Sequence, residues 1–143
     1  MALEVFDNFM LVQHNGNAID LDAVGALKIM LVDDTRAPVL ATDANMTAIE
    51  ANEMTNGNGY TTGGKVLANT AVDLATGTVT FDGGDQLYEQ NESGFTDARY
   101  AILYDTASDV PICSADLGSD RGHVTGDLTL EMAATGIIAI TNS

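Results

Sequence analysis

Residues 94–118, GFTDARYAILYDTASDVPICSADLG, decide the fold class of this chain. Alternate residues of 98–105, ARYAILYD, point to opposite faces, and alternation with aromatic and branched side chains is typical of a β-strand. The run 105–109, DTASD, consists of residues that bond their own backbone and form turns. Pro111 then suits the start of a second strand. We therefore predict a long β-hairpin, whose almost wholly apolar first strand is central and covered on both faces.

Shorter strands, separated by turn residues, are predicted around this hairpin. Residues 42–55, TDANMTAIEANEMT, are the only helical candidate, because Thr42 or Asp43 can cap a thin apolar stripe. The predicted strands cover residues 26–32, 65–74, 78–81, 127–132 and 137–141. Short strands with frequent turns predict an all-β fold, namely an antiparallel β-sandwich or a small, jelly-roll-like barrel with one short helix near residues 43–55.

The length of 143 residues predicts a single domain, 1–143. Its first part, residues 1–13, MALEVFDNFMLVQ, is either an N-terminal arm or an edge strand in the protein's own sheet. No basic region precedes an apolar run there, so we expect no export signal and synthesis in a cytosol. No stretch approaches the ~18 apolar residues that a membrane span needs.

The charge balance is extreme, because 21 acidic residues face five basic ones and the net charge is −16. Binding to nucleic acid depends on Lys and Arg that neutralise phosphates. We therefore expect no nucleic acid and no anionic membrane as a direct partner. The charge itself fits simple solubility, the surface of a particle or salty surroundings.

The residue types that carry catalysis or bind metals are present without the spacing that such sites need. His14 and His123 lie in polar loops without a companion at zinc spacing, so we expect solvated histidines. No serine lies in a nucleophile motif. The acid pairs fit turn residues rather than a calcium loop; they are Asp33 with Asp34, Asp82 with Asp85, and Asp116 with Asp120.

Two further features are read as structural. The glycine-rich run 56–64 leads through Lys65 into a strand, whereas a phosphate loop leads into a helix. Cys113 is the only cysteine and lies in a predicted strand, so we predict a buried structural thiol and no internal disulfide. We therefore predict no catalytic residues, no cofactor and no metal, and hence no enzyme.

Aromatic and apolar residues next to loops are the candidates for contact with a partner. Tyrosine is enriched at interfaces, and Tyr60 and Tyr88 lie beside loops, whereas Tyr100 and Tyr104 are expected in the core. The N-terminal segment 1–12 is the second candidate. The predicted interface residues are Phe6, Phe9, Leu11, Tyr60 and Tyr88.

The region from about residue 50 to residue 141 resembles small structural proteins of tailed bacteriophages, of the head-decoration or head-fibre type. The order of five runs carries it: GYTTGGKVL (59–67), TVTFDGGDQLYE (78–89), GFTDARYAILYDT (94–106), VPICSADLGS (110–119) and GDLTLEMAATGIIAIT (126–141). This chain departs from the pattern at Tyr88, where a tryptophan is expected, and at Cys113, where an aliphatic residue is expected.

The resemblance implies a β-rich, non-enzymatic and usually oligomeric virion subunit. We expect a capsid decoration or cement protein that is made in the host cytoplasm and binds the major capsid protein on the outer surface of the virion. A homo-oligomer is expected, and a trimer would suit a local three-fold axis. The alternatives are a neck, tail or head-fibre component and a carbohydrate-binding β-sandwich, which the absence of Trp disfavours.

Overall fold

The chain folds as an all-β protein with antiparallel sheets, as predicted, since strand outweighs helix by 39% to 9%. The computed structural model describes residues 3–141. Within this range the strands are β1 (Leu3–Val5), β2 (Leu27–Val32), β3 (Lys65–Val66), β4 (Ala71–Ala75), β5 (Thr78–Asp82), β6 (Gln86–Tyr88), β7 (Ala98–Asp105), β8 (Val110–Arg121), β9 (Leu128–Leu130) and β10 (Ile138–Thr141). They form sheets ordered β1-β8-β7-β2-β3, β10-β5-β4 and β6-β9.

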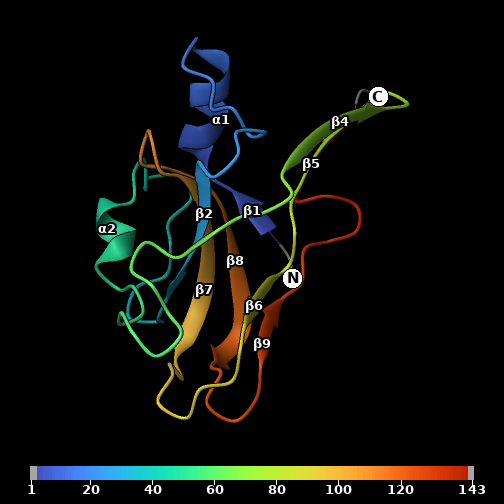
Figure 1. The fold of residues 1–143 in the computed structure, drawn as a ribbon. Helices are drawn as coiled ribbons and strands as arrows, with labels where there is room; N and C mark the ends of the chain where they lie inside the picture. The colour runs from blue at the N-terminus through green and yellow to red at the C-terminus, as the bar shows by residue number, and fades with distance from the viewer. Residues whose placement is uncertain (1–2, 142–143) are drawn as a thin grey trace.

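The predicted hairpin is β7 and β8, and β7 is the middle strand of the five-stranded sheet (Figure 1). Every residue of β7 except Arg99 and Tyr100 is buried, which confirms that the strand is covered on both faces. The turn is closed by Asp105, whose carboxylate accepts hydrogen bonds from the backbone N–H and the hydroxyl of Ser108. Local turn chemistry and strand alternation therefore act together here.

The neighbouring strands complete the core. β2 pairs along its whole length with residues 100–105 of β7, and its residues from Ile29 to Val32 are all buried. Cys113 of β8 is fully buried, and this burial raises the pKa of its thiol to about 12. The thiol therefore stays protonated and unreactive at neutral pH, which confirms the structural role predicted for it.

The N-terminal segment confirms the predicted edge strand in part and adds a helix that was not predicted. Residues 3–5 form an edge strand against β8, and the chain then turns into helix α1 (Asp7–His14). Phe6 and Phe9 lie three residues apart, which places both rings on the side that meets the core. Their exposed fractions are 0% and 3%. This segment is therefore packed on the chain's own sheet.

The predicted helix over residues 42–55 is wrong in extent, because α2 covers only Thr47–Glu50. Asp43 does not cap a helix; its carboxylate accepts hydrogen bonds from the Arg36 guanidinium and the backbone N–H of Val39. At the other end Glu53 pairs with Val32 of β2, which draws the chain out of the helix. Three residues of the predicted apolar stripe, Met46, Ile49 and Met54, are nevertheless buried, whereas the fourth, Ala51, is exposed.

Candidate interaction surface

The three-stranded sheet of β4, β5 and β10, which we call the arm, extends away from the rest of the molecule (Figure 1). Its base is anchored at Phe81, which is 2% exposed and whose carbonyl accepts a hydrogen bond of 2.7 Å from the backbone N–H of Ile137. Its tip is the two-residue turn of Thr76 and Gly77, with φ of 50° and 77°. Both residues have positive φ, and this turn geometry matches the twist of the flanking strands.

The register of the arm separates its side chains into two faces. Residues that oppose each other across paired strands lie on the same face. One face is wholly apolar and consists of two cross-strand rows, which are Val72, Phe81 and Ile138, followed by Leu74, Val79 and Ile140. The other face carries threonine, alanine and aspartate side chains, and the hydroxyls of Thr78 and Thr141 lie 3.1 Å apart on it.

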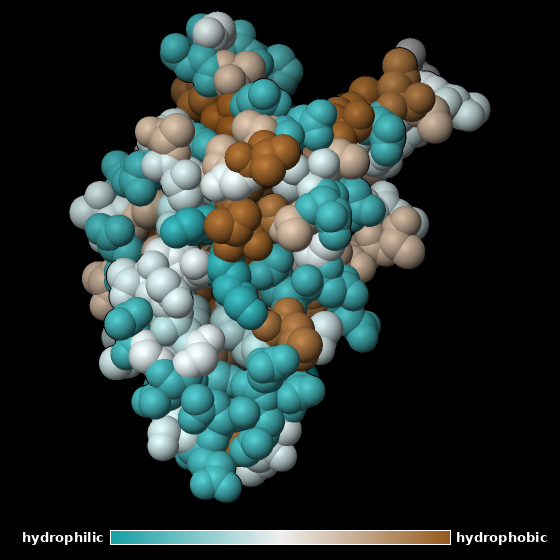
Figure 2. Space-filling view, in the orientation of Figure 1, coloured by the Kyte–Doolittle hydropathy of each residue, from teal (hydrophilic) through white to brown (hydrophobic). Residues whose placement is uncertain are grey.

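Much of the apolar face is uncovered. The exposed fractions are 74% for Leu74, 58% for Ile140, 44% for Val72 and 40% for Val79. Figure 2 shows this concentration of hydrophobic side chains on the arm. A sheet with one apolar face ordinarily buries that face against another layer. The apolar face of the arm is largely without such a layer.

A cleft of about 800 Å³ lies between the apolar face of the arm and the segment that carries α1. The α1 side of the cleft is formed mainly by Phe9, Met10, Ile19 and Leu21, and polar side chains, including those of Gln13 and Asp20, also line it. Met10 is 44% exposed and the neighbouring Leu11 is 61% exposed. Among residues 3–141, six of the ten exposed large apolar side chains therefore belong to α1 or the arm.

Charge is distributed unequally over the molecule. The apolar face of the arm carries none, because Asp73 and Asp82 lie in the rows of the opposite face. Acidic residues are frequent in the loops around β6 to β9, at the end far from α1, and this end is hydrophilic in Figure 2. We call this the acidic end, although the α1 end also exposes Asp7, Asp20 and Asp22 beside its apolar side chains.

Four of the five predicted interface residues are wrong as surface contacts. Phe6, Phe9, Tyr60 and Tyr88 are 0–3% exposed, so the chain's own core already covers them. Only Leu11 lies on the surface as predicted. Residues 1 and 2, which belonged to the predicted N-terminal contact segment, lie outside the described residues.

Tyr60 is buried because its hydroxyl finds partners inside the fold. It accepts a hydrogen bond of 3.1 Å from the backbone N–H of Leu31 and donates one of 2.8 Å to the Glu53 carboxylate. The same carboxylate accepts from the backbone N–H of Gly63, so the glycine-rich loop is fastened to the sheet. Burial raises the pKa of Tyr60 well above its usual range.

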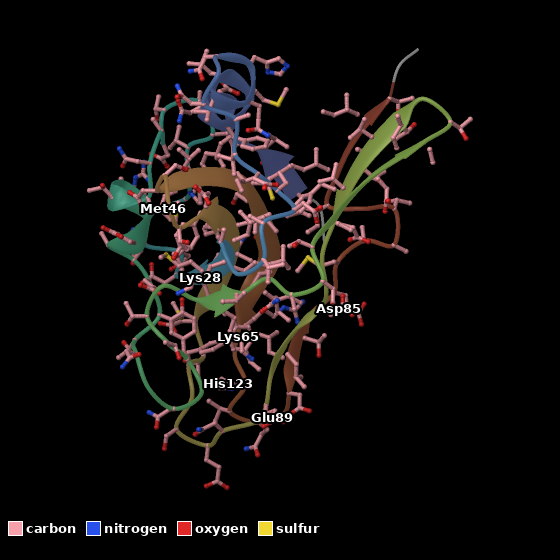
Figure 3. The ribbon with its side chains drawn as sticks, turned by 45° about the horizontal axis from the view of Figure 1, so that its top comes forward. Lys28, Met46, Lys65, Asp85, Glu89 and His123 are labelled. Carbon is pink, nitrogen blue, oxygen red and sulfur yellow. The ribbon has the colours of Figure 1, made fainter. Side chains whose placement is uncertain are left out.

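His123 is also buried, at 0% exposure, and this corrects the prediction of a solvated histidine. Its Nδ1 lies 2.7 Å from the carbonyl oxygen of Glu89, and its ring lies 4.3 Å from that of Phe95 between centroids. Figure 3 shows His123 and Glu89 at the end opposite α1. Gly94 makes room for the ring, since a Cβ there would lie 2.2 Å from Nε2. His14, by contrast, is exposed at the end of α1.

The remaining polar residues that drew attention in the sequence have structural roles. Carboxylates of the acid pairs accept backbone hydrogen bonds, including Asp33 from Thr35 and Asp85 from Met132, each at 2.8 Å. Lys65 donates to the carbonyl of Leu87 and lies over the ring of Tyr88. Within residues 3–141 no group of three or more His, Cys, Asp or Glu side chains is placed to hold a metal ion.

Comparison with known proteins does not indicate a function, so the function is inferred from the surface formed by α1 and the arm. No protein-family model, curated protein or solved structure matches this chain. No helix among the described residues has the length and apolar character required to cross a membrane. The one sequence signal for the candidate surface is the alternation of apolar and polar residues through 71–82 and 138–141. It marks the strands but does not reveal which face stays uncovered.

Proposed function

We propose that this chain is a non-enzymatic structural protein of a bacteriophage virion, and specifically a capsid decoration protein that binds the outer surface of the assembled shell. The observation that carries this proposal is the uncovered apolar end formed by α1 and the arm on a strongly acidic domain. Contiguous exposed apolar surface marks contact with other proteins. The resemblance of the sequence to phage head proteins supplies the kind of assembly.

The contact with the shell is assigned to the outer side of α1. Leu11 and Met10 are exposed there, with Asp7 and His14 about one helical turn away on either side. Docking through this side leaves the acidic end directed into solvent, where like charges keep separate particles apart. A protein that binds only the assembled shell stabilises it by mass action, by ~2.7 kcal/mol per site when its free concentration is 100 times Kd.

The proposal is tested by adding the purified protein to particles that lack it. We expect density at regular positions over the capsid faces by cryo-electron microscopy, together with a rise in the temperature at which particles release their genome. Leu11→Glu should abolish both effects. Leu87→Glu is the matched control, because Leu87 is 43% exposed on β6, outside α1 and the arm, and should leave both unchanged.

The image also separates the alternatives. Density confined to the portal or tail would favour a neck, tail or head-fibre component, and no density on any part of the particle would refute the virion proposal. A carbohydrate-binding module would need an exposed aromatic platform. The four phenylalanines and four tyrosines all lie within the described range, and none is exposed, which argues against that class.

A further inference from the structure

The apolar face of the arm requires a partner whose own surface is apolar and uncharged. Its two rows contain six aliphatic or aromatic side chains and no polar one. Interfaces generally pair opposite charges. A partner that recognised this protein by its net charge of −16 would therefore be basic and would bind acidic side chains. The apolar face of the arm has no acidic side chain. Its contact energy therefore comes from apolar burial alone.

A second copy of this chain meets that requirement at the arm itself. In a contact with two-fold symmetry, the same patch appears on both sides and must be complementary to itself. A patch with charges of one sign fails this condition, because like charges then face each other. The two rows of the apolar face meet the condition, since their six side chains are apolar and uncharged.

Two copies that each carry −16 repel one another over most of their surfaces. The approach that brings arm against arm keeps the acidic ends far apart, because these lie at the opposite end of the molecule (Figures 1 and 2). Charge therefore favours the arm over the acidic end as the place where a second copy comes into contact. The outward edges of β4 and β10 also have no strand partner within residues 3–141, and such edges pair readily with another chain.

The exposed area matches a reversible contact. The four uncovered residues of the arm are 40–74% exposed and together amount to about two whole apolar side chains, or roughly 120–240 Å² per arm. A standard stable interface buries ~800 Å² per partner, of which somewhat more than half is apolar. The arm alone is thus the apolar centre of a small interface, and the association should depend on protein concentration.

We propose that the arm is a self-association surface, by which two copies pack their apolar faces together about a two-fold axis. This inference does not depend on the virion proposal, because it concerns the protein in isolation. It differs from the trimer expected from the symmetry of a shell, and the measured mass decides between them.

The test has two parts and uses the full chain. Sedimentation equilibrium in 0.5 M salt should show a monomer–dimer equilibrium that Leu74→Glu and Ile140→Glu each abolish. Ala75→Glu, which adds the same charge on the opposite face of β4, is the control and should retain the dimer. In the second part, Val79→Cys should be joined into a dimer by a short bis-maleimide that spans about 10 Å, the spacing of sheets packed face to face. Thr80→Cys, the next residue on the same strand, should not. Cys113 is buried and does not interfere.

Several outcomes would overturn the inference. They are a monomer at every accessible concentration, a dimer that survives both substitutions of the apolar face, equal loss of the dimer in the control, and a trimer. A protein that stays monomeric while its arm binds an apolar dye would also overturn it. Because Leu11 lies outside the arm, failure of shell binding in Leu11→Glu and failure of self-association in Leu74→Glu are read separately.

Discussion

Leu74→Ala should weaken the pairing of two copies far more than it weakens the fold. The substitution removes about three carbons, which are worth ~2.4 kcal/mol when fully buried. Leu74 is 74% exposed in the isolated chain, so about 1.8 kcal/mol of this becomes available on pairing. A two-fold contact contains the residue twice, and the loss is therefore about 3.5 kcal/mol, or a roughly 300- to 400-fold increase in Kd.

The stability of the single chain should change little, because only the part of Leu74 that is already covered is lost, about 0.6 kcal/mol. The dissociation constants are measured by sedimentation equilibrium at low and high salt, and the free energy of unfolding by urea titration. Salt should strengthen pairing of the wild-type chain, since it screens the repulsion between two acidic molecules. Leu87→Ala serves as the control and should leave Kd unchanged.

The size of the effect also tests the symmetry of the contact. If the residue occurred once at each interface, as in a ring of copies, the same substitution would raise Kd only about 20-fold per contact. An increase below tenfold, or an equal increase in the Leu87→Ala control, would refute the assignment of the contact to the apolar face.

Three further predictions concern the fold that supports the surface. Tyr60→Phe should cost about 1–3 kcal/mol in urea unfolding, because it leaves the backbone N–H of Leu31 without its 3.1 Å acceptor; an unchanged midpoint would contradict this. Gly94→Ala should lower Tm, since its Cβ would lie 2.2 Å from Nε2 of His123, and the double variant with His123→Ala should lose less than the sum of the two single losses. Additive losses would show that the ring is not the obstacle. The hydrogen bond from its guanidinium partner lowers the pKa of Asp43, so this carboxylate contributes stability above its unfolded pKa of about 3.9, and the contribution is lost as the pH falls through the lower folded value. A plot of Tm against pH from 2 to 6 should therefore fall less steeply for Asp43→Asn than for the wild type, and parallel curves would contradict the assignment.

The central hairpin could be predicted from sequence because its signals are local and agree with one another. Alternation through residues 98–105 sets the two faces of β7, and the aspartate and serine side chains of 105–109 set the turn. The burial of Cys113 followed from its place on the second strand. A long regular strand can be predicted from its own sequence, because every residue contributes to the same alternating pattern.

The burial of Tyr60 and His123 could not be predicted, because the groups that cover them are distant in sequence. The partners of the Tyr60 hydroxyl are Leu31 and Glu53, and the His123 ring lies against Phe95 and the backbone of Gly94. The local signal around both residues is polar and rich in glycine, which usually indicates an exposed loop. The sequence pattern of such a loop is the same whether the loop is solvated or covers an aromatic ring.

The arm shows a different limit. The sequence predicted strands over residues 65–74, 78–81 and 137–141, but a strand whose apolar face is covered has the same sequence pattern as one whose face is open. What distinguishes them is the position of α1, which stands across a cleft from Val79 and Ile140 rather than against them. That separation is a property of the tertiary structure.

The acidic composition and the arm have a combined consequence that neither has alone. An exposed apolar sheet with free edges ordinarily invites unspecific aggregation. On this chain, the net charge of −16 opposes every contact that brings the acidic surfaces together, whereas the wholly uncharged rows of the arm escape this penalty. The charge therefore does more than keep the protein in solution. In the proposed dimer, it disfavours the orientations that bring the acidic surfaces together and leaves the one that packs arm against arm.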